Sequence, residues 1–187
     1  MHRLNEVVHH WIYQDYYGRI KRLEKERIFC CHQMTHLLDV ARIAYIKNLE
    51  ENLGFEKDVI YTAAVLHDIG KSFQYKWTIP HEVAGEKIAK EILTTLPEDA
   101  QFTEEEQQQI LLAIRGHRRK HEGMEPIEEL FYDSDKRSRM CHSYLFSPGL
   151  SLYTRHLQAP GEIPWISLFS AHRSHAPMHT CVYRHHN

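Results

Sequence analysis

Residue types that bind metals occupy the apolar rows of five segments with helical periodicity, and this feature constrains the fold most. Burying a carboxylate or an imidazole costs several kcal/mol unless the group is paired. A single histidine of this kind is usually a hydrogen-bonded core residue, but five helices that each bring one inward need a common partner. A divalent cation neutralises carboxylates and accepts several imidazoles at once, so the pattern predicts a metal site in a helical core. The residues concerned are His36, His67 with Asp68, His81, His117 and Asp135.

The apolar rows also decide between two neighbouring aspartates near the end of the periodic region. Asp135 follows Ile127 and Phe131 at offsets of 8 and 4, which places all three on one helix face. Asp133 fits that row less well. Asp135 is therefore the better candidate ligand.

The rest of the periodic region predicts an all-α fold, because no segment alternates between apolar and polar residues as a half-buried strand would. Gly70 stands where a helix would stop. Thr103, followed by three glutamates, is typical of a helix start with a capping box. The expected helices cover residues 3–16, 17–28, 33–50, 56–68, 80–96, 103–117 and 126–140.

The composition changes abruptly after residue 140 of the 187-residue chain. Residues 141–187 contain one acid, no lysine, seven of the sixteen histidines and four of the seven prolines, with no sustained period. We therefore expect a helical metal-binding domain over 1–140 and an irregular or disordered tail over 141–187. A shifted reading frame is one alternative origin of the tail. A zinc-binding tail is another, with the ligands His179, Cys181, His185 and His186.

Charge and cysteine usage limit the partners and the compartment. The formal net charge of -2 gives no basic field, so no nucleic-acid duplex is expected as a partner. No apolar run approaches the ~18 residues that would suggest a membrane span. Four cysteines occur without a CxxC spacing, and the adjacent Cys30 and Cys31 make a poor disulfide pair. Reduced thiols and a cytoplasmic location are therefore predicted.

Four motifs, taken in order along the chain, resemble one known family. They are HLLDVARIA from His36, AAVLHDIGK around His67 and Asp68, PHEVAG from Pro80, and SDKRSR around Asp135. In this order and spacing the chain resembles the HD domain superfamily of metal-dependent phosphohydrolases, over about residues 30 to 140. It looks most similar to small bacterial HD-domain proteins. The resemblance implies a compact HD-domain helical bundle.

The resemblance also implies a ligand set. One metal ion would be held by His36, His67, Asp68 and Asp135. Members with two metals add histidines from the middle helices, and His81 and His117 match those positions. These two histidines would otherwise contact the phosphate of the substrate. Mixed imidazole and carboxylate ligands suit Mn, Fe, Co, Ni or Zn.

The implied chemistry is hydrolysis of a small phosphorylated molecule, such as a nucleotide or a phosphate ester, by metal-activated water. His67, Asp68 and Lys71 are the expected catalytic residues. The alternative for Lys71 is a solvated loop lysine. The expected substrate-binding residues are His32, Lys71, His81, His117 and Arg118.

Two other function classes fit the same residues. A diiron oxygenase of the HD fold would use the same histidines, and a non-catalytic binding module would use none of this chemistry. Intact ligand positions argue against the binding module. A homodimer is left open by the sequence.

Overall fold

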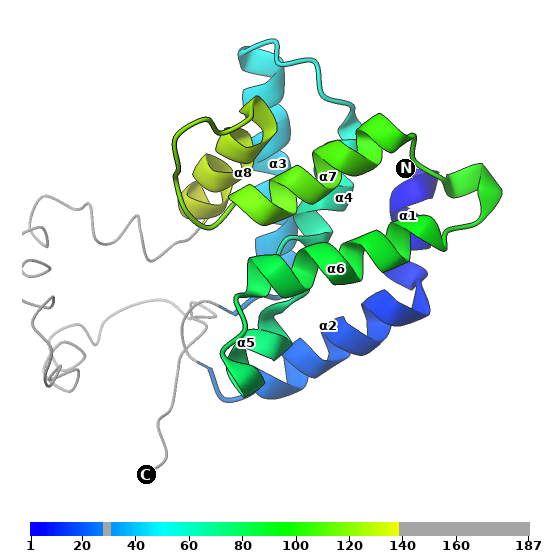
Figure 1. The fold of residues 1–187 in the computed structure, drawn as a ribbon, viewed down its shortest axis with the longest axis vertical. Helices are drawn as coiled ribbons and strands as arrows, with labels where there is room; N and C mark the ends of the chain where they lie inside the picture. Colours follow the sequence, from blue (N-terminus) through cyan, green and yellow to red (C-terminus); the bar gives the residue numbers. More distant parts are fainter. Residues whose placement is uncertain (28–30, 139–187) are drawn as a thin grey trace, which may run out of the picture.

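The protein is described here from a computed structural model, which describes residues 1–27 and 31–138. Over these residues the all-α prediction is confirmed, and no strand is present among them. Figure 1 shows the helices and the short 3-10 turn η1 in chain order. Their bounds are α1 His2–His9, α2 Trp11–Leu23, α3 Met34–Glu50, α4 Lys57–Leu66, α5 Lys71–Trp77, α6 His81–Thr94, η1 Glu98–Ala100, α7 Glu104–Gly116 and α8 Pro126–Arg137.

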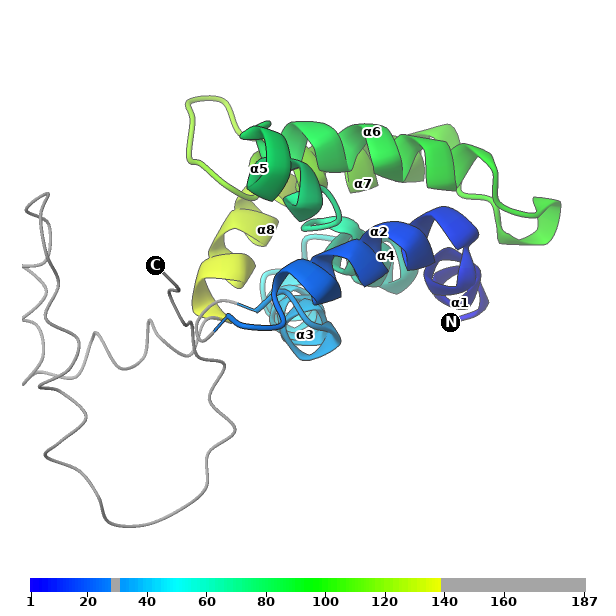
Figure 2. The ribbon, with the colours of Figure 1, turned by 90° about the horizontal axis from the view of Figure 1, so that it is seen from below.

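Helix α4 forms the centre of the bundle, as its almost continuous apolar run predicts. Every residue from Val59 to Leu66 is buried except Tyr61. α4 packs against α1, α3 and α7. Figure 2 shows α4 lying between α3 on one side of the bundle and the pair α6 and α7 on the other. A turn that follows α4 directly therefore opens into the middle of the molecule.

Capping boxes fix the starts of α7 and α8. The Thr103 hydroxyl accepts a hydrogen bond from the Glu106 amide at 3.2 Å, and the Glu106 carboxylate accepts one from the Thr103 amide at 2.9 Å. This confirms the predicted start of α7. Glu125 and Glu128 form the same arrangement at the start of α8, which has Pro126 in its first turn. α7 and α8 pack against each other, and α8 also packs against α3.

The N-terminal helices differ from the prediction. Residues 3–16 were expected as one helix, but the extended backbone of His10 (ψ 133°) breaks it into α1 and α2. The break turns Trp11 out of its expected apolar row, and 71% of this side chain is exposed. Helix α5 was not predicted, because its seven residues are too few for a helical period to be recognised.

Gly70 is required for a reason other than the helix stop expected from the sequence. Its φ of -79° is accessible to any residue. A Cβ atom at this position would lie 2.1 Å from the carbonyl oxygen of His81 and 2.5 Å from the amide nitrogen of Gly85. The absent side chain thus lets α6 approach the turn between α4 and α5. This contact places His81 beside the end of α4.

Two further expectations concern the cysteines and the membrane. Cys31 is disulfide-bonded, so the prediction of reduced thiols is wrong for this residue. Its partner lies outside the described residues, as do all the residues of the tail predicted over 141–187 and the zinc ligands proposed there. No helix in the described part of the chain is long and apolar enough to cross a bilayer.

Candidate metal centre

Four of the predicted ligands converge in the interior of the bundle. His36 comes from the first turn of α3, and Asp135 comes from the third turn of α8. His67 and Asp68 lie in the turn that directly follows α4, rather than on the helix itself. One ligand atom from each of the four lies within 4.8 Å of the others. Residues 99 positions apart in the sequence therefore meet around one small volume.

Asp68 is at the centre of this first group. Its Oδ2 atom lies 3.1 Å from Nε2 of His67 and 3.5 Å from Nε2 of His36. Oδ1 of Asp135 lies 3.5 Å from Nε2 of His36 and 3.8 Å from Nε2 of His67. The two imidazole nitrogens thus alternate with two carboxylate oxygens, which is the donor set that a transition-metal ion prefers.

The hydrogen bonding around these atoms tests whether a cation fits. Nδ1 of His67 donates to the carbonyl oxygen of Ala64 at 2.6 Å, which turns Nε2 toward the site. Nε2 of His36, Nε2 of His67 and both oxygens of Asp68 are buried without a hydrogen-bond partner within the described ranges. Buried polar atoms of this kind are costly unless something binds them. A divalent cation would satisfy them together, so the residues fit the predicted metal.

A second group shares Asp68 with the first. The Oδ1 atom of Asp68 lies 3.2 Å from Nε2 of His81 and 3.7 Å from Nε2 of His117. His81 is the first residue of α6 and His117 follows the last residue of α7. Their Nε2 atoms are 2.9 Å apart, and these three ligand atoms also lie within 4.8 Å of one another. One carboxylate thus presents one oxygen to each group, which is the arrangement of a bridging ligand.

In both histidines of the second group, the ring nitrogen Nδ1 contacts an oxygen atom of the protein. Nδ1 of His117 donates to the carbonyl oxygen of Ile114 at 2.7 Å, and Nδ1 of His81 contacts the side-chain oxygen Oε1 of Gln74 at 2.5 Å. Such outer hydrogen bonds fix the tautomer and aim the other ring nitrogen at the ligand. The outer contact of His36 is weaker, since its Nδ1 lies 3.2 Å from the Ser138 hydroxyl.

Burial keeps most of these imidazoles neutral. It lowers the pKa of His36 and His117, although the Asp68 carboxylate acts in the opposite direction. Burial also lowers the pKa of His81 to about 2, helped by the charge of Lys71 and opposed by Asp68. A neutral imidazole is the form that binds a metal, so these three groups are ready to bind at neutral pH.

The charges within the site shift the pKa values of His67 and Asp68 in opposite directions. Burial opposes the charged form of His67, but the field of Asp68 and Asp135 outweighs it and raises the pKa of His67. Burial likewise opposes ionisation of Asp68, but Lys71, His67 and His32 outweigh it and hold the pKa of Asp68 well below its usual value. A proton on His67 would therefore offset part of the negative charge of Asp68 and Asp135.

Lys71 lies in the site and not in a solvated loop. It is the first residue of α5, its side chain is 10% exposed, and its Nζ atom lies 3.4 Å from Oδ1 of Asp68. The solvated alternative for this lysine is therefore wrong. Its cationic group faces the same carboxylate oxygen that His81 and His117 approach.

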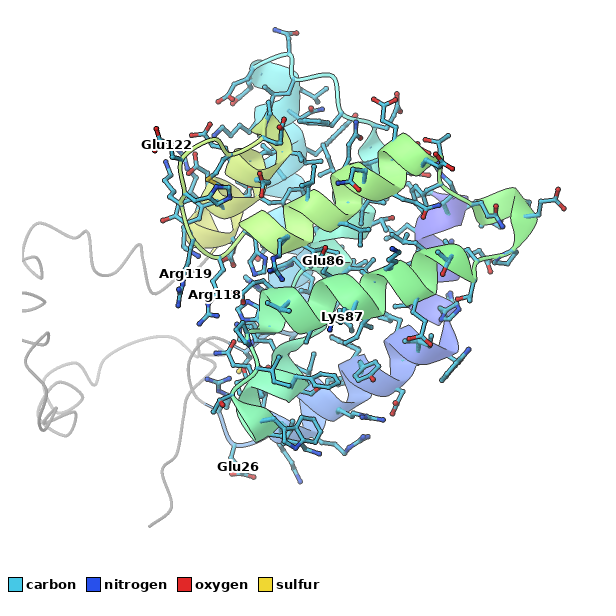
Figure 3. All side chains as sticks on the ribbon, in the orientation of Figure 1. Glu26, Glu86, Lys87, Arg118, Arg119 and Glu122 are labelled. Carbon is cyan, nitrogen blue, oxygen red and sulfur yellow. The ribbon has the colours of Figure 1, made fainter. Side chains whose placement is uncertain are left out.

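The remaining candidates, Asp133 and Arg118, belong to neither ligand group. Asp133, the less favoured aspartate, forms an ion pair with Lys47 at 2.8 Å. Arg118 places one guanidinium nitrogen 3.0 Å from each carboxylate oxygen of Glu82, and Glu82 in turn lies 3.5 Å from Nδ1 of His81. Figure 3 shows Arg118 and Arg119 at the edge of the bundle beside the ends of α6 and α7.

His32, which was expected to bind substrate, is buried beside the first group. Its side chain is 7% exposed, and its Nε2 atom lies 3.5 Å from Oδ2 of Asp68. Its other ring nitrogen contacts Glu24, a buried residue that the sequence did not indicate. Glu24 lies within a strongly charged segment, IKRLEKER, and such segments are usually solvated helix faces. No pattern in the sequence distinguishes Glu24 from Glu26, the exposed glutamate two residues further along.

Comparison with known proteins gives two matches. The sequence model of the HD domain matches residues 34–143. An uncharacterized protein of Clostridium beijerinckii is 48% identical over 143 residues, which cover 76% of this chain and 87% of that protein. No solved structure gives a significant match. The family match begins at the first turn of α3 and includes every residue of both groups.

Proposed function

This chain belongs to the HD domain family, and on that premise we propose that it is a metal-dependent phosphohydrolase acting on a small phosphorylated molecule, such as a nucleotide or a phosphate ester. The observation that carries the proposal is the set of buried atoms that have no hydrogen-bond partner among residues 1–27 and 31–138, namely Nε2 of His36, Nε2 of His67 and both oxygens of Asp68. HD domains bind divalent metals and are mostly hydrolases, which supports the assignment.

The residues of the first group would hold the ion, namely His36, His67, Asp68 and Asp135. A divalent ion bound there would supply Lewis acidity toward a phosphoryl oxygen and would acidify a water molecule. The His67 imidazole needs no rearrangement to receive it, because the Ala64 carbonyl already orients this ring. We place Mn, Fe, Co, Ni or Zn in this position, since the donors mix nitrogen and oxygen.

Lys71 is the residue of this chain that we assign to the substrate phosphate. Its ammonium group is buried beside Asp68 and can offset the negative charge that develops on a phosphoryl group. His81 and His117 lie on the same side of Asp68, so they would contact either the same phosphate or a second ion. Arg118, which is bound to Glu82, would orient the start of α6 and with it His81.

A substrate panel with metal analysis tests the proposal. Purified protein would be assayed for phosphomonoesterase, phosphodiesterase and nucleotide hydrolysis with Mn, Co, Ni and Mg. Asp68→Ala should abolish turnover, while Asp133→Asn should not, since Asp133 pairs with Lys47 outside the site. Metal-stimulated hydrolysis that survives Asp68→Ala unchanged would refute the assignment.

A diiron oxygenase is the second candidate, and the shared carboxylate of Asp68 is the observation that favours it. Two ions bridged by one carboxylate could be held between the two groups. Bound iron with turnover that requires oxygen would favour this candidate. Hydrolysis that proceeds under anaerobic conditions would favour the phosphohydrolase.

A further inference from the structure

A buried carboxylate lies behind the metal centre and outside both ligand groups. Glu24 follows the last residue of α2, and its side chain is 2% exposed. Its oxygens accept hydrogen bonds from the His32 backbone amide at 2.7 Å, from His32 Nδ1 at 2.5 Å and from the Tyr75 hydroxyl at 2.6 Å. An Arg27 guanidinium nitrogen lies 3.4 Å away. This carboxylate thus ties together α2, α5 and the segment that leads into α3.

The way Glu24 binds His32 fixes the direction of the imidazole. One carboxylate oxygen holds the backbone amide and the other holds the ring, so the residue cannot turn without breaking one of the two bonds. Because Nδ1 contacts Glu24, the other ring nitrogen, Nε2, is directed toward the metal site, where it lies 3.5 Å from Oδ2 of Asp68. The adjacent backbone is held as well, since the Met34 amide donates to the Tyr17 hydroxyl at 2.8 Å.

Asp68 gains a third imidazole contact from this arrangement. The Nε2 atoms of His32, His36 and His67 all lie 3.1–3.5 Å from the same oxygen, Oδ2. The other oxygen faces Lys71, His81 and His117. Without His32, the Asp68 carboxylate would have one contact fewer to resist its rotation. Its Oδ2 would then be held less firmly toward the first group, and its Oδ1 less firmly toward the second.

We propose that Glu24 is a positioning residue of the metal centre, which acts through His32 to hold the Asp68 carboxylate in the orientation that binds the ion of the first group. This inference rests on the proposed function, because it requires a metal at that position. Outer hydrogen-bond partners of metal ligands typically change metal affinity by about 10- to 100-fold when they are removed. Glu24 and His32 are the described residues that form such a chain to Asp68 from the α2 side.

Titration with Co²⁺, followed by its visible absorption bands, tests this role without any assay of turnover. We expect Glu24→Gln and His32→Ala each to weaken Co²⁺ binding by about tenfold or more and to shift the bands, since both change the geometry of Asp68. Glu106→Gln, which removes a carboxylate paired with Arg3 outside both ligand groups, serves as the control and should bind Co²⁺ as the unmodified protein does.

The double variant separates a positioning role from a general effect of charge. If Glu24 acts through His32, Glu24→Gln combined with His32→Ala binds Co²⁺ no more weakly than His32→Ala alone. If Glu24 acts only as a distant negative charge, its substitution weakens binding equally with and without His32. The second result would overturn the proposal.

Other results of the Co²⁺ titration would also decide against the positioning role. Wild-type affinity and wild-type bands in both single variants would overturn the positioning role and leave the proposed function intact. Failure of the unmodified protein to bind Co²⁺ would overturn both. Should Glu24→Gln fail to fold, His32→Gln, which retains a polar side chain beside Glu24, provides the same comparison.

Discussion

Nζ of Lys71 lies 3.4 Å from Oδ1 of Asp68, on the side of the carboxylate that also faces His81 and His117. A lysine in this position adds a fixed positive charge where a second cation would otherwise bind. In the first group a lysine contacts the other carboxylate: Nζ of Lys136 lies 3.0 Å from Oδ2 of Asp135, whereas the two imidazoles approach its Oδ1 atom. The asymmetry favours one ion with a phosphate on the lysine side over two equivalent ions.

Replacement of Lys71 by methionine should separate these two effects. We expect Lys71→Met to lower kcat/KM for a phosphorylated substrate by about 100-fold, the loss typical of one electrostatic contact in the transition state. Removal of the ammonium group also removes its repulsion of a second ion, so the bound metal per chain should rise. Kinetics and metal content measured on the same preparation check both. Unchanged activity would contradict the role of Lys71.

Asp135 and Asp133 provide a matched pair of substitutions on α8. Asp135→Asn should weaken metal binding by about 100-fold, because it removes a charged donor from the first group. Asp133→Asn should leave metal binding unchanged, since this carboxylate pairs with Lys47 at 2.8 Å. Isothermal titration with Mn²⁺ or Zn²⁺ distinguishes them. Equal effects of the two substitutions would place the metal elsewhere.

The affinity for metal should fall in acid because of His67. The pKa of His67 is raised, so its Nε2 is the first to be protonated as the pH is lowered, and the proton must leave before the metal binds. His36, His81 and His117 have lowered pKa values and stay neutral, and Asp68 stays ionised. Below the pKa of His67, affinity should decrease by about tenfold per pH unit. Affinity that is constant down to pH 5 would contradict this account.

Gly70 should be intolerant of even a methyl group. Gly70→Ala places a Cβ atom against the backbone of His81 and Gly85, neither of which can move aside as a flexible side chain could. We expect a loss of about 1–3 kcal/mol in the free energy of unfolding, the range for overpacked cores. Denaturant unfolding measures it. Gly54→Ala would be a poor control because of its φ of +80°, whereas Gly18→Ala, with a 3.5 Å contact only to the Arg22 side chain, is suitable.

Much of the site could be predicted because its residues interrupt apolar rows. His36 and Asp135 lie in such rows, and the structure buries Asp135 fully and leaves the His36 side chain 13% exposed. The choice of Asp135 over Asp133 needed only the helical period. The order of the motifs then identified the family, which the comparison with known proteins confirms.

The residues that were missed depend on tertiary contacts. Glu24 is buried because the segment of His32 and Met34 folds back over the end of α2, and its local sequence resembles a solvated helix face. Helix α5 is too short for periodicity to show, yet it positions Lys71, Gln74 and Tyr75 around the site. The exposure of Trp11 follows from the break at His10, for which the sequence has no glycine or proline signal.

Location of the metal by anomalous X-ray scattering tests the central claim most directly. Crystals grown with Mn²⁺ or Zn²⁺ and measured at the absorption edge should show one strong peak among four ligand atoms, Nε2 of His36, Nε2 of His67 and one oxygen each of Asp68 and Asp135. A peak remote from Asp68, or none at saturating metal, would contradict the account.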